Sequence, residues 1–161
     1  MSGTLYGVGV GPGNFTGVRI AVAAAKGLSL SLDIPAIGVT MFDALRYGYD
    51  GAVYTAVSAP RGAAYIDAGS QTEPRLVAAS GDIEPYHNPK ADPRLIGAVG
   101  QEWADALDSQ PVPAKHMCAT AIAFVAGQRF AQDRDIPPPK PMYIKSPDAA
   151  PPRVPPPQIV P

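Results

Sequence analysis

Residues 11–19 read Gly-Pro-Gly-Asn-Phe-Thr-Gly-Val-Arg, and this glycine-rich stretch is the most informative part of the sequence. A short apolar run, Leu5 to Val10, precedes it, and a long apolar segment follows. An apolar run that ends in glycine and proline predicts a buried strand entering a tight turn. The segment beyond, from about Phe15 to Leu32, is predicted to be a helix that Asp33-Ile34-Pro35 ends, because the residue before a proline avoids helical geometry.

A second buried strand is predicted at Ala36 to Val39, directly after the helix. A strand, a helix and a strand at this spacing form a right-handed crossover, which makes the two strands parallel. Apolar residues at helical spacing then predict another helix at Met41 to Tyr49. Residues 1–50 therefore indicate an α/β unit.

The pattern changes after residue 50. A turn at Pro60–Gly62 indicates an antiparallel meander. The predicted strands are Val53 to Ala59, Ala63 to Ala68, Arg75 to Ala79 and Leu95 to Val99, and the predicted helices lie near Trp103 to Leu107 and at Ala119 to Ala131. We expect residues 51–136 to form a second unit. Residues 137–161, which hold 11 of the 20 prolines, are expected to form an extended tail, with one last strand possible at Tyr143-Ile144-Lys145.

Composition argues against several classes of protein. The net charge is −1 and the basic residues are scattered along the sequence, so we expect no direct grip on nucleic acid. The single cysteine, Cys118, allows no intrachain disulfide. Charge, glycine and proline interrupt each apolar run, and no signal-peptide pattern is visible, so the expectation is a cytoplasmic chain without a membrane span.

The glycine-rich turn allows two interpretations. Orphan N–H groups and the dipole at a helix start favour a phosphate. However, Val18 follows Gly17 where a phosphate-binding loop needs lysine, and position 14 lacks the third glycine of the dinucleotide pattern. The alternative is a structural turn of Gly11, Pro12, Gly13 and Gly17, with Asn14 or Thr16 capping the helix. Arg19 is expected to form a surface ion pair rather than to contact a phosphate.

The predicted helix is apolar over more than half of its circumference. Its charged residues, Arg19 and Lys26, form one narrow polar stripe with Asp33. A one-sided surface helix needs an apolar stripe of roughly 100° only. The excess apolar surface is either buried inside this chain or packed against a partner, and the sequence leaves both possibilities open.

Catalytic constellations are sparse. His87 and His116 lie 29 residues apart and outside any metal-binding helix pattern, and Cys118 has no base opposite it on a helix, so a buried structural cysteine is expected. Asp67 is the acid inside an apolar run, and an outward position is predicted for it. We therefore expect no catalytic residue, no metal and no cofactor.

These residues resemble the TsaB (YeaZ-like) family. Its members carry Gly-Pro-Gly-Ser-Phe-Thr-Gly-Leu-Arg-Ile-Gly, an alanine-rich helix, and Ile-Pro-Val-Val-Gly-Val-Ser. The corresponding stretches here are Gly11 to Ile20, the helix to Leu32, and Ile34 to Thr40. Weaker matches in the same order are Ser58 to Tyr65 and Pro141 to Lys145.

The resemblance implies an actin/hexokinase-like (ASKHA) α/β lobe with a smaller mixed α/β second lobe. It implies a non-catalytic scaffold that pairs with a TsaD-like catalytic subunit, works with a TsaE-like ATPase and reaches tRNA only indirectly, with a homodimer possible. The expected product is threonylcarbamoyladenosine beside the anticodon. The implied partner interface on the helix is Phe15, Val18, Val22, Ala25, Leu28 and Leu32. The alternatives are a nucleotide-binding enzyme of actin-like fold and a glycoprotease-like peptidase.

The chain departs from the family at its start. Family members have an Asp-Thr-Ser turn, further strands and a helix before the Gly-Pro-Gly segment, whereas ten residues precede Gly11 here. The expected lobe is therefore incomplete at its N-terminus, and a truncated chain or a mis-assigned start codon is the hypothesis.

Overall fold

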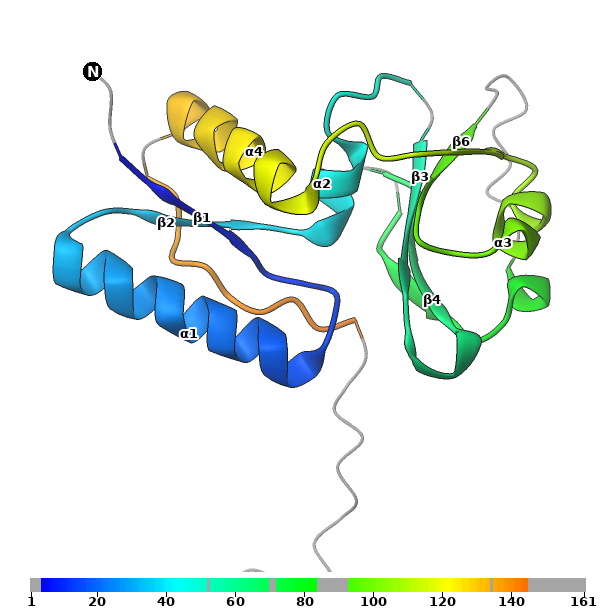
Figure 1. The fold of residues 1–161 in the computed structure, drawn as a ribbon, viewed down its shortest axis with the longest axis horizontal. Helices are drawn as coiled ribbons and strands as arrows, with labels where there is room; N and C mark the ends of the chain where they lie inside the picture. Colours follow the sequence, from blue (N-terminus) through cyan, green and yellow to red (C-terminus); the bar gives the residue numbers. More distant parts are fainter. Residues whose placement is uncertain (1–3, 52, 70–71, 84–92, 134, 145–161) are drawn as a thin grey trace, which may run out of the picture.

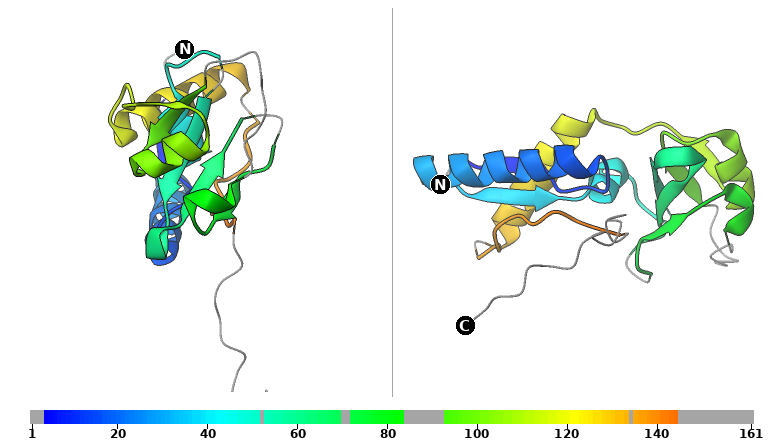
Figure 2. Two further views of the ribbon diagram at one scale, coloured as in Figure 1. Left: turned by 90° about the vertical axis from the view of Figure 1, so that its right-hand side faces the viewer. Right: turned by 90° about the horizontal axis from the view of Figure 1, so that it is seen from below.

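The computed structural model describes residues 4–51, 53–69, 72–83, 93–133 and 135–144. These residues form two lobes that lie side by side, each built around its own sheet (Figures 1 and 2). The first lobe has a two-stranded sheet and the second has a five-stranded sheet.

The first lobe is the predicted strand–helix–strand crossover. β1 (Tyr6–Gly9) and β2 (Ala36–Val39) are parallel, and α1 (Phe15–Leu32) connects them. Asp33, in the left-handed region at φ 52°, caps α1 two residues before Pro35. The prediction of two parallel strands joined by this helix is confirmed; β2 is largely buried, whereas Val8 is the one buried residue of β1.

Two helices cover opposite faces of the β1–β2 pair (Figure 1). Between α1 and the strands lies a small core of Val8, Val10, Val22, Ala25 and Ala36. The other face carries α4 (Cys118–Gln132) together with α2 (Met41–Arg46). The core on that side is formed by Ile37, Val39, Ala44, Ala121, Val125 and Ala126.

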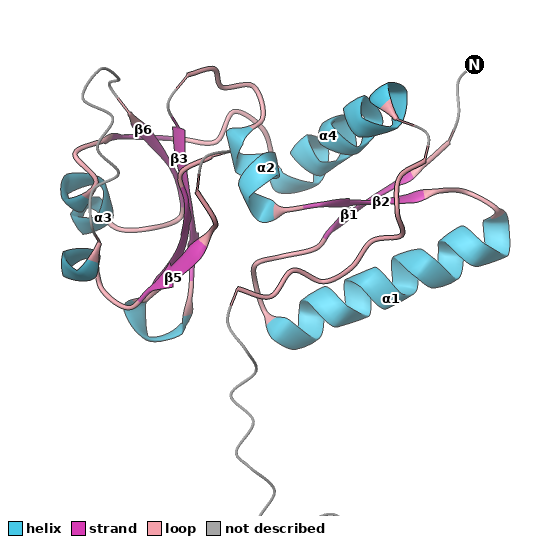
Figure 3. Cartoon of the chain, turned by 180° about the vertical axis from the view of Figure 1, so that it is seen from behind, coloured by secondary structure: helices cyan, strands magenta, loops and turns pink. Residues whose placement is uncertain are grey.

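The helix α4 belongs in space to the first lobe, although its sequence position falls inside the expected second unit, 51–136. It can approach β1 closely because Gly7 has no side chain: a Cβ added there would lie 3.1 Å from the Cβ of Ala126. The segment after α4 also returns along the first lobe toward the start of α1 (Figure 3), where the N–H of Met142 donates to the carbonyl of Val10 at 2.7 Å. The first lobe is thus assembled from both ends of the described chain.

The second lobe contains the predicted meander. Its strands are β3 (Val53–Ser58), β4 (Ala64–Asp67), β5 (Arg75–Val77), β6 (Arg94–Gly97) and β7 (Gln110–Val112), and its helix is α3 (Gln101–Ala106). The order across the sheet is β5-β4-β3-β6-β7. The first three strands are antiparallel, whereas β6 and β7 add in parallel beyond β3.

Two local expectations were wrong, and the strand β7 was not predicted. β7 contains Pro111 at its centre, which an edge strand tolerates, and β7 lies at the edge of the sheet. α2 ends at Arg46 rather than at Tyr49, before Gly48 at φ +84°. Tyr143 and Ile144 form no strand, and Lys145 lies outside the described residues, as does the remainder of the proline-rich tail.

Helix α2 forms two ion pairs, one to the second lobe and one within the first. Arg46 lies 2.6 Å from Asp67 on β4, and Asp43 lies 2.6 Å from Arg129 on α4. Asp67 was predicted to face outward, but it is 6% exposed. The prediction failed because both faces of β4 are covered: Ile66 faces the core of the second lobe and Asp67 faces α2 of the first.

Candidate functional site

The glycine-rich turn is held by the rest of the chain. The carbonyl of Gly11 accepts from the N–H of Met41 at 2.8 Å, and the preceding carbonyl, that of Val10, accepts from Met142. Gly11 itself has φ +101°, and a Cβ there would lie 3.2 Å from the carbonyl oxygen of Met142. The turn therefore joins three segments of the first lobe, which favours the structural interpretation over a phosphate cradle.

Asn14 is the N-cap of α1, as one of the two alternatives predicted. Its side-chain oxygen accepts from the N–H of Gly17 at 2.8 Å. Asn14→Ala removes this bond and leaves the Gly17 N–H unpaired, so we expect the free energy of unfolding to fall by about 1 kcal/mol. Urea denaturation followed by circular dichroism measures this change, and Asn14→Asp, which retains an acceptor, should lose much less.

Arg19, for which a surface ion pair was expected, forms none with a described residue. Its Nε donates to the hydroxyl of Tyr143 at 2.7 Å, and its guanidinium lies 4.0 Å from the ring centroid of Phe15. The side chain thus fastens the segment that follows α4 to the first turn of α1.

The outer side of α1 is exposed and apolar. Val22 and Ala25 are the buried residues of the helix, and on the opposite side lie Ile20, Ala24 and Gly27, which share one face by their helical spacing. Larger apolar side chains flank this face, with Leu30 88% exposed, and nothing lies within 4 Å of the position of a Gly27 Cβ. We call Ile20, Ala24, Gly27, Leu28 and Leu30 the α1 outer face.

The predicted interface residues divide into two groups. Phe15, Leu28 and Leu32 are exposed and remain candidates for a partner contact. Val22 and Ala25 are buried in the chain's own core, and Val18 packs partly against it. Three of the six residues predicted for the partner are therefore exposed, and the structure adds Ile20, Ala24, Gly27 and Leu30 to the surface that a partner can reach.

Among the described residues, α1 is also long and apolar enough to cross a membrane, with a mean hydropathy of 1.3 over 18 residues. The sequence-based expectation of no span did not anticipate this. A helix that packs on other protein surfaces meets the same criterion, so length and hydropathy do not choose between lipid and protein. Arg19 and Lys26 weigh against lipid, since a charged side chain within a membrane-spanning helix is energetically costly.

The residues considered for catalysis do not come together. Within the described ranges, no group of three His, Cys, Asp or Glu side chains is placed to hold a metal ion, and His87 lies outside those ranges. Cys118 is exposed rather than buried as predicted, because it begins α4 at the surface between the lobes. His116 packs its ring against Tyr47 and Phe124.

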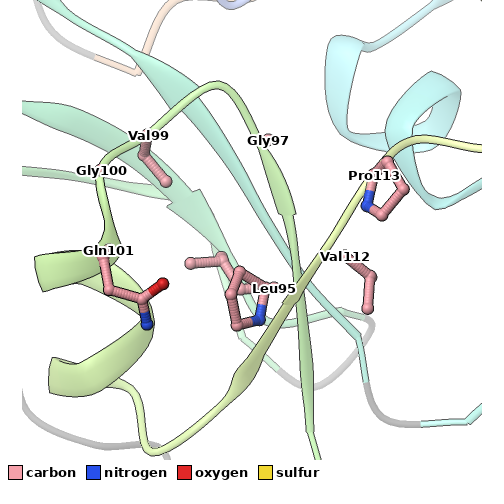
Figure 4. A pocket seen from close by; sticks show the side chains of 8 residues that line it. Leu95, Gly97, Val99, Gly100, Gln101, Val112 and Pro113 are labelled. Atoms are coloured by element: carbon pink, nitrogen blue, oxygen red, sulfur yellow. The ribbon is translucent and has the colours of Figure 1, made fainter.

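A pocket of about 280 Å³ lies in the second lobe beside β6, β7 and the start of α3 (Figure 4). Apolar residues such as Leu95, Val99 and Val112 line it, with Gln101 as a polar side chain. None of the lining residues has an ionisable side chain, so this pocket offers no group for acid–base catalysis.

Comparison with known proteins gives a consistent result. The family model described as TsaD, tRNA N6-adenosine threonylcarbamoyltransferase, matches residues 6–85. An uncharacterized protein of Mycobacterium tuberculosis (strain H37Rv) is 34% identical over 149 residues, covering 89% of this chain and 65% of that protein. The tRNA threonylcarbamoyladenosine biosynthesis protein TsaB of Bacillus subtilis is 43% identical over 61 residues, covering 36% of this chain and 27% of that protein.

Solved structures show the same likeness. A Pseudomonas aeruginosa protein with similarity to peptidase YeaZ has a TM-score of 0.65 and 25% identity, covering 85% of this chain and 71% of the other. YeaZ from the same organism has a TM-score of 0.59 and 27% identity, covering 84% and 71%. The predicted actin-like α/β fold class is confirmed by this likeness.

Proposed function

Since this chain is a TsaB/YeaZ-like protein, we propose that it serves as a non-catalytic partner subunit in the biosynthesis of threonylcarbamoyladenosine on tRNA. In this role it pairs with a TsaD-like catalytic subunit in the cytoplasm, and a TsaE-like ATPase joins through the complex. The modified nucleoside is the adenosine beside the anticodon. A homodimer is a further possible assembly of the same surface.

The observation that carries the proposal is the α1 outer face. An 18-residue helix normally buries an apolar stripe on one side only, but α1 is apolar on both sides and buries two residues within this chain. The exposed side has small residues, Ala24 and Gly27, between larger ones, which lets a second helix approach closely. Burying such a surface in a complex is favourable by about 25 cal/mol per Å² of apolar area.

The chemistry that the chain displays supports a scaffold more than an enzyme. The carbonyls of Val10 and Gly11 accept from Met142 and Met41, and the N–H of Gly17 donates to Asn14, so the glycine-rich turn serves as a structural element of the first lobe. The 280 Å³ pocket has no ionisable lining. No observation favours the nucleotide-binding enzyme or the peptidase in the same specific way.

The test is to mix the purified chain with the TsaD-like protein of the same organism and to measure mass by size-exclusion chromatography with light scattering. We expect a stable heteromeric species. Ala24→Glu places a charge in the middle of the α1 outer face, and desolvating that charge in the interface should weaken pairing at least a hundredfold.

The matched control is Ala123→Glu, which makes the same change at an exposed alanine of α4. It should pair like the unmodified chain, and both variants should have unchanged circular dichroism. A folded, monodisperse chain that does not pair would refute the proposal. A folded Ala24→Glu variant that pairs normally would remove α1 as the contact.

A further inference from the structure

Two basic residues that are distant in sequence lie close together in the folded chain. Arg94 and Lys115, at the start of β6 and in the segment between β7 and α4, both lie against the ring of Tyr49. The guanidinium carbon of Arg94 is 5.2 Å from the ring centroid, and the Lys115 Nζ is 4.5 Å from it. Two positive charges that are distant in sequence thus lie on one aromatic side chain where the lobes meet.

The backbone after α2 holds these cations in place. The Lys115 Nζ donates to the carbonyl of Gly48, and Arg94 donates to the carbonyl of Asp50. Gly48 has φ +84°, and a Cβ there would lie 3.2 Å from Cδ of Lys115 and 3.6 Å from Nε2 of His116. The bare glycine therefore leaves the space in which Lys115 and His116 lie.

Stacked rings continue the surface beyond Lys115. Tyr47 and Phe124 stack with centroids 5.5 Å apart and planes at 15°, and His116 packs on both, at 5.3 Å from Tyr47 and 5.8 Å from Phe124. Phe124 is 48% exposed although it is a large apolar side chain. We call Tyr47, Tyr49, Arg94, Lys115, His116 and Phe124 the junction patch.

We propose that the junction patch binds single-stranded RNA, as the contact of this subunit with the loop of its tRNA substrate. The proposal rests on the proposed function and adds a direct contact to it, where the scattered basic residues of the sequence predicted none. Exposed rings stack on bases of any sequence, and cations beside them neutralise the phosphates between those bases. Arg94 and Lys115 give the patch two positive charges and it contains no acid, so its charge favours a polyanion.

This combination fits RNA better than a protein partner. A docking surface for protein needs a contiguous apolar centre, whereas here charged groups alternate with rings. A flexible loop can place one base on Phe124 and a phosphate at Lys115. The α1 outer face belongs to other residues, so RNA binding and partner binding are separable by substitution.

The experiment measures fluorescence polarisation of a labelled 17-nucleotide RNA stem-loop with the full chain, at about 50 mM and about 200 mM salt. We expect binding in the micromolar range at the lower salt, within the roughly 10⁻⁴–10⁻⁶ M of non-specific contacts, and weaker at the higher. Phe124→Ala should weaken binding about tenfold through lost stacking. Lys115→Ala should weaken it and reduce the salt slope by about 1.

Two control variants match these changes away from the patch. Lys26→Ala removes an exposed cation and Leu30→Ala an exposed apolar side chain on α1, and both should bind RNA like the unmodified chain. Three results would overturn the proposal. The first is no RNA binding at low salt, and the second is an equal loss of affinity for Lys115→Ala and Lys26→Ala. The third is full competition by polyglutamate together with no effect of Phe124→Ala. The patch variants should still pair with the TsaD-like protein, so a failure of either proposal is recognised separately.

Discussion

Replacing Ala25 by glutamate is expected to destabilise the first lobe strongly, whereas the same replacement at the neighbouring Ala24 is expected to leave its stability almost unchanged. Ala25 is 8% exposed and packs in the core of Val8, Val10, Val22 and Ala36. A glutamate there adds volume to a packed site and buries a carboxylate that no described cation of that core can pair with. We expect a loss of about 3 kcal/mol or more.

The difference between the two sites separates folding from binding. Ala24 faces solvent, so its glutamate stays hydrated in the free chain and costs no more than about 0.5 kcal/mol. Urea denaturation should show a large fall in the midpoint for Ala25→Glu and almost none for Ala24→Glu. Equal midpoints would mean that α1 does not pack on the β1–β2 pair through Val22 and Ala25.

The contrast between Ala24 and Ala25 also shows which features of α1 could be predicted from the sequence. The boundaries of α1 follow from local signals, namely the Asn14 cap and Pro35 after the helix, and they were predicted correctly. The direction of the helix was not, because apolar residues occur around most of its circumference. When hydropathy is nearly uniform, it cannot show which side meets the sheet, so Val22 and Ala25 were assigned to the partner.

The parts of the fold that sequence reasoning missed depend on distant contacts. The helix α4 was predicted, but its place beside β1 depends on Gly7 and Ala126, which are far apart in sequence. The buried position of Asp67 likewise depends on Arg46 in the other lobe. A local sequence pattern does not indicate contacts between residues that are far apart in sequence. The crossover and the meander could be predicted because they follow from hydrophobic periodicity and turns along one continuous stretch.

The junction patch could not be predicted for the same reason, because it is formed by residues that are distant in sequence. Tyr49, Arg94 and Lys115 come from three segments, and each alone is an ordinary surface residue. Their proximity depends on the return of the chain from β7 to α4 across the lobe boundary. A count of charges along the sequence therefore gave a correct net charge and still predicted no cationic surface.

Arg46→Met is expected to cost about 3 kcal/mol, because it leaves a buried carboxylate without its cation. The side chain of Asp67 is 8% exposed, and that of Arg46 is 28% exposed. Without Arg46, the carboxylate of Asp67 keeps a hydrogen bond from the N–H of Gly69 at 3.2 Å. Breaking a buried pair by removing one partner typically costs about 3–5 kcal/mol, whereas removing both charges can be nearly neutral.

The double variant Arg46→Met/Asp67→Leu should therefore be more stable than Arg46→Met alone, as measured by urea denaturation. Arg129→Met provides the comparison, because this ion pair is more exposed: the side chain of Arg129 is 38% exposed and that of Asp43 is 31% exposed. The pair should therefore contribute no more than about 1 kcal/mol to stability. The variant also loses the hydrogen bond from Arg129 to the carbonyl of Gly38. Additive losses at Arg46 and Asp67 would mean that the two side chains act independently. In that case α2 would connect the lobes by packing rather than through this ion pair.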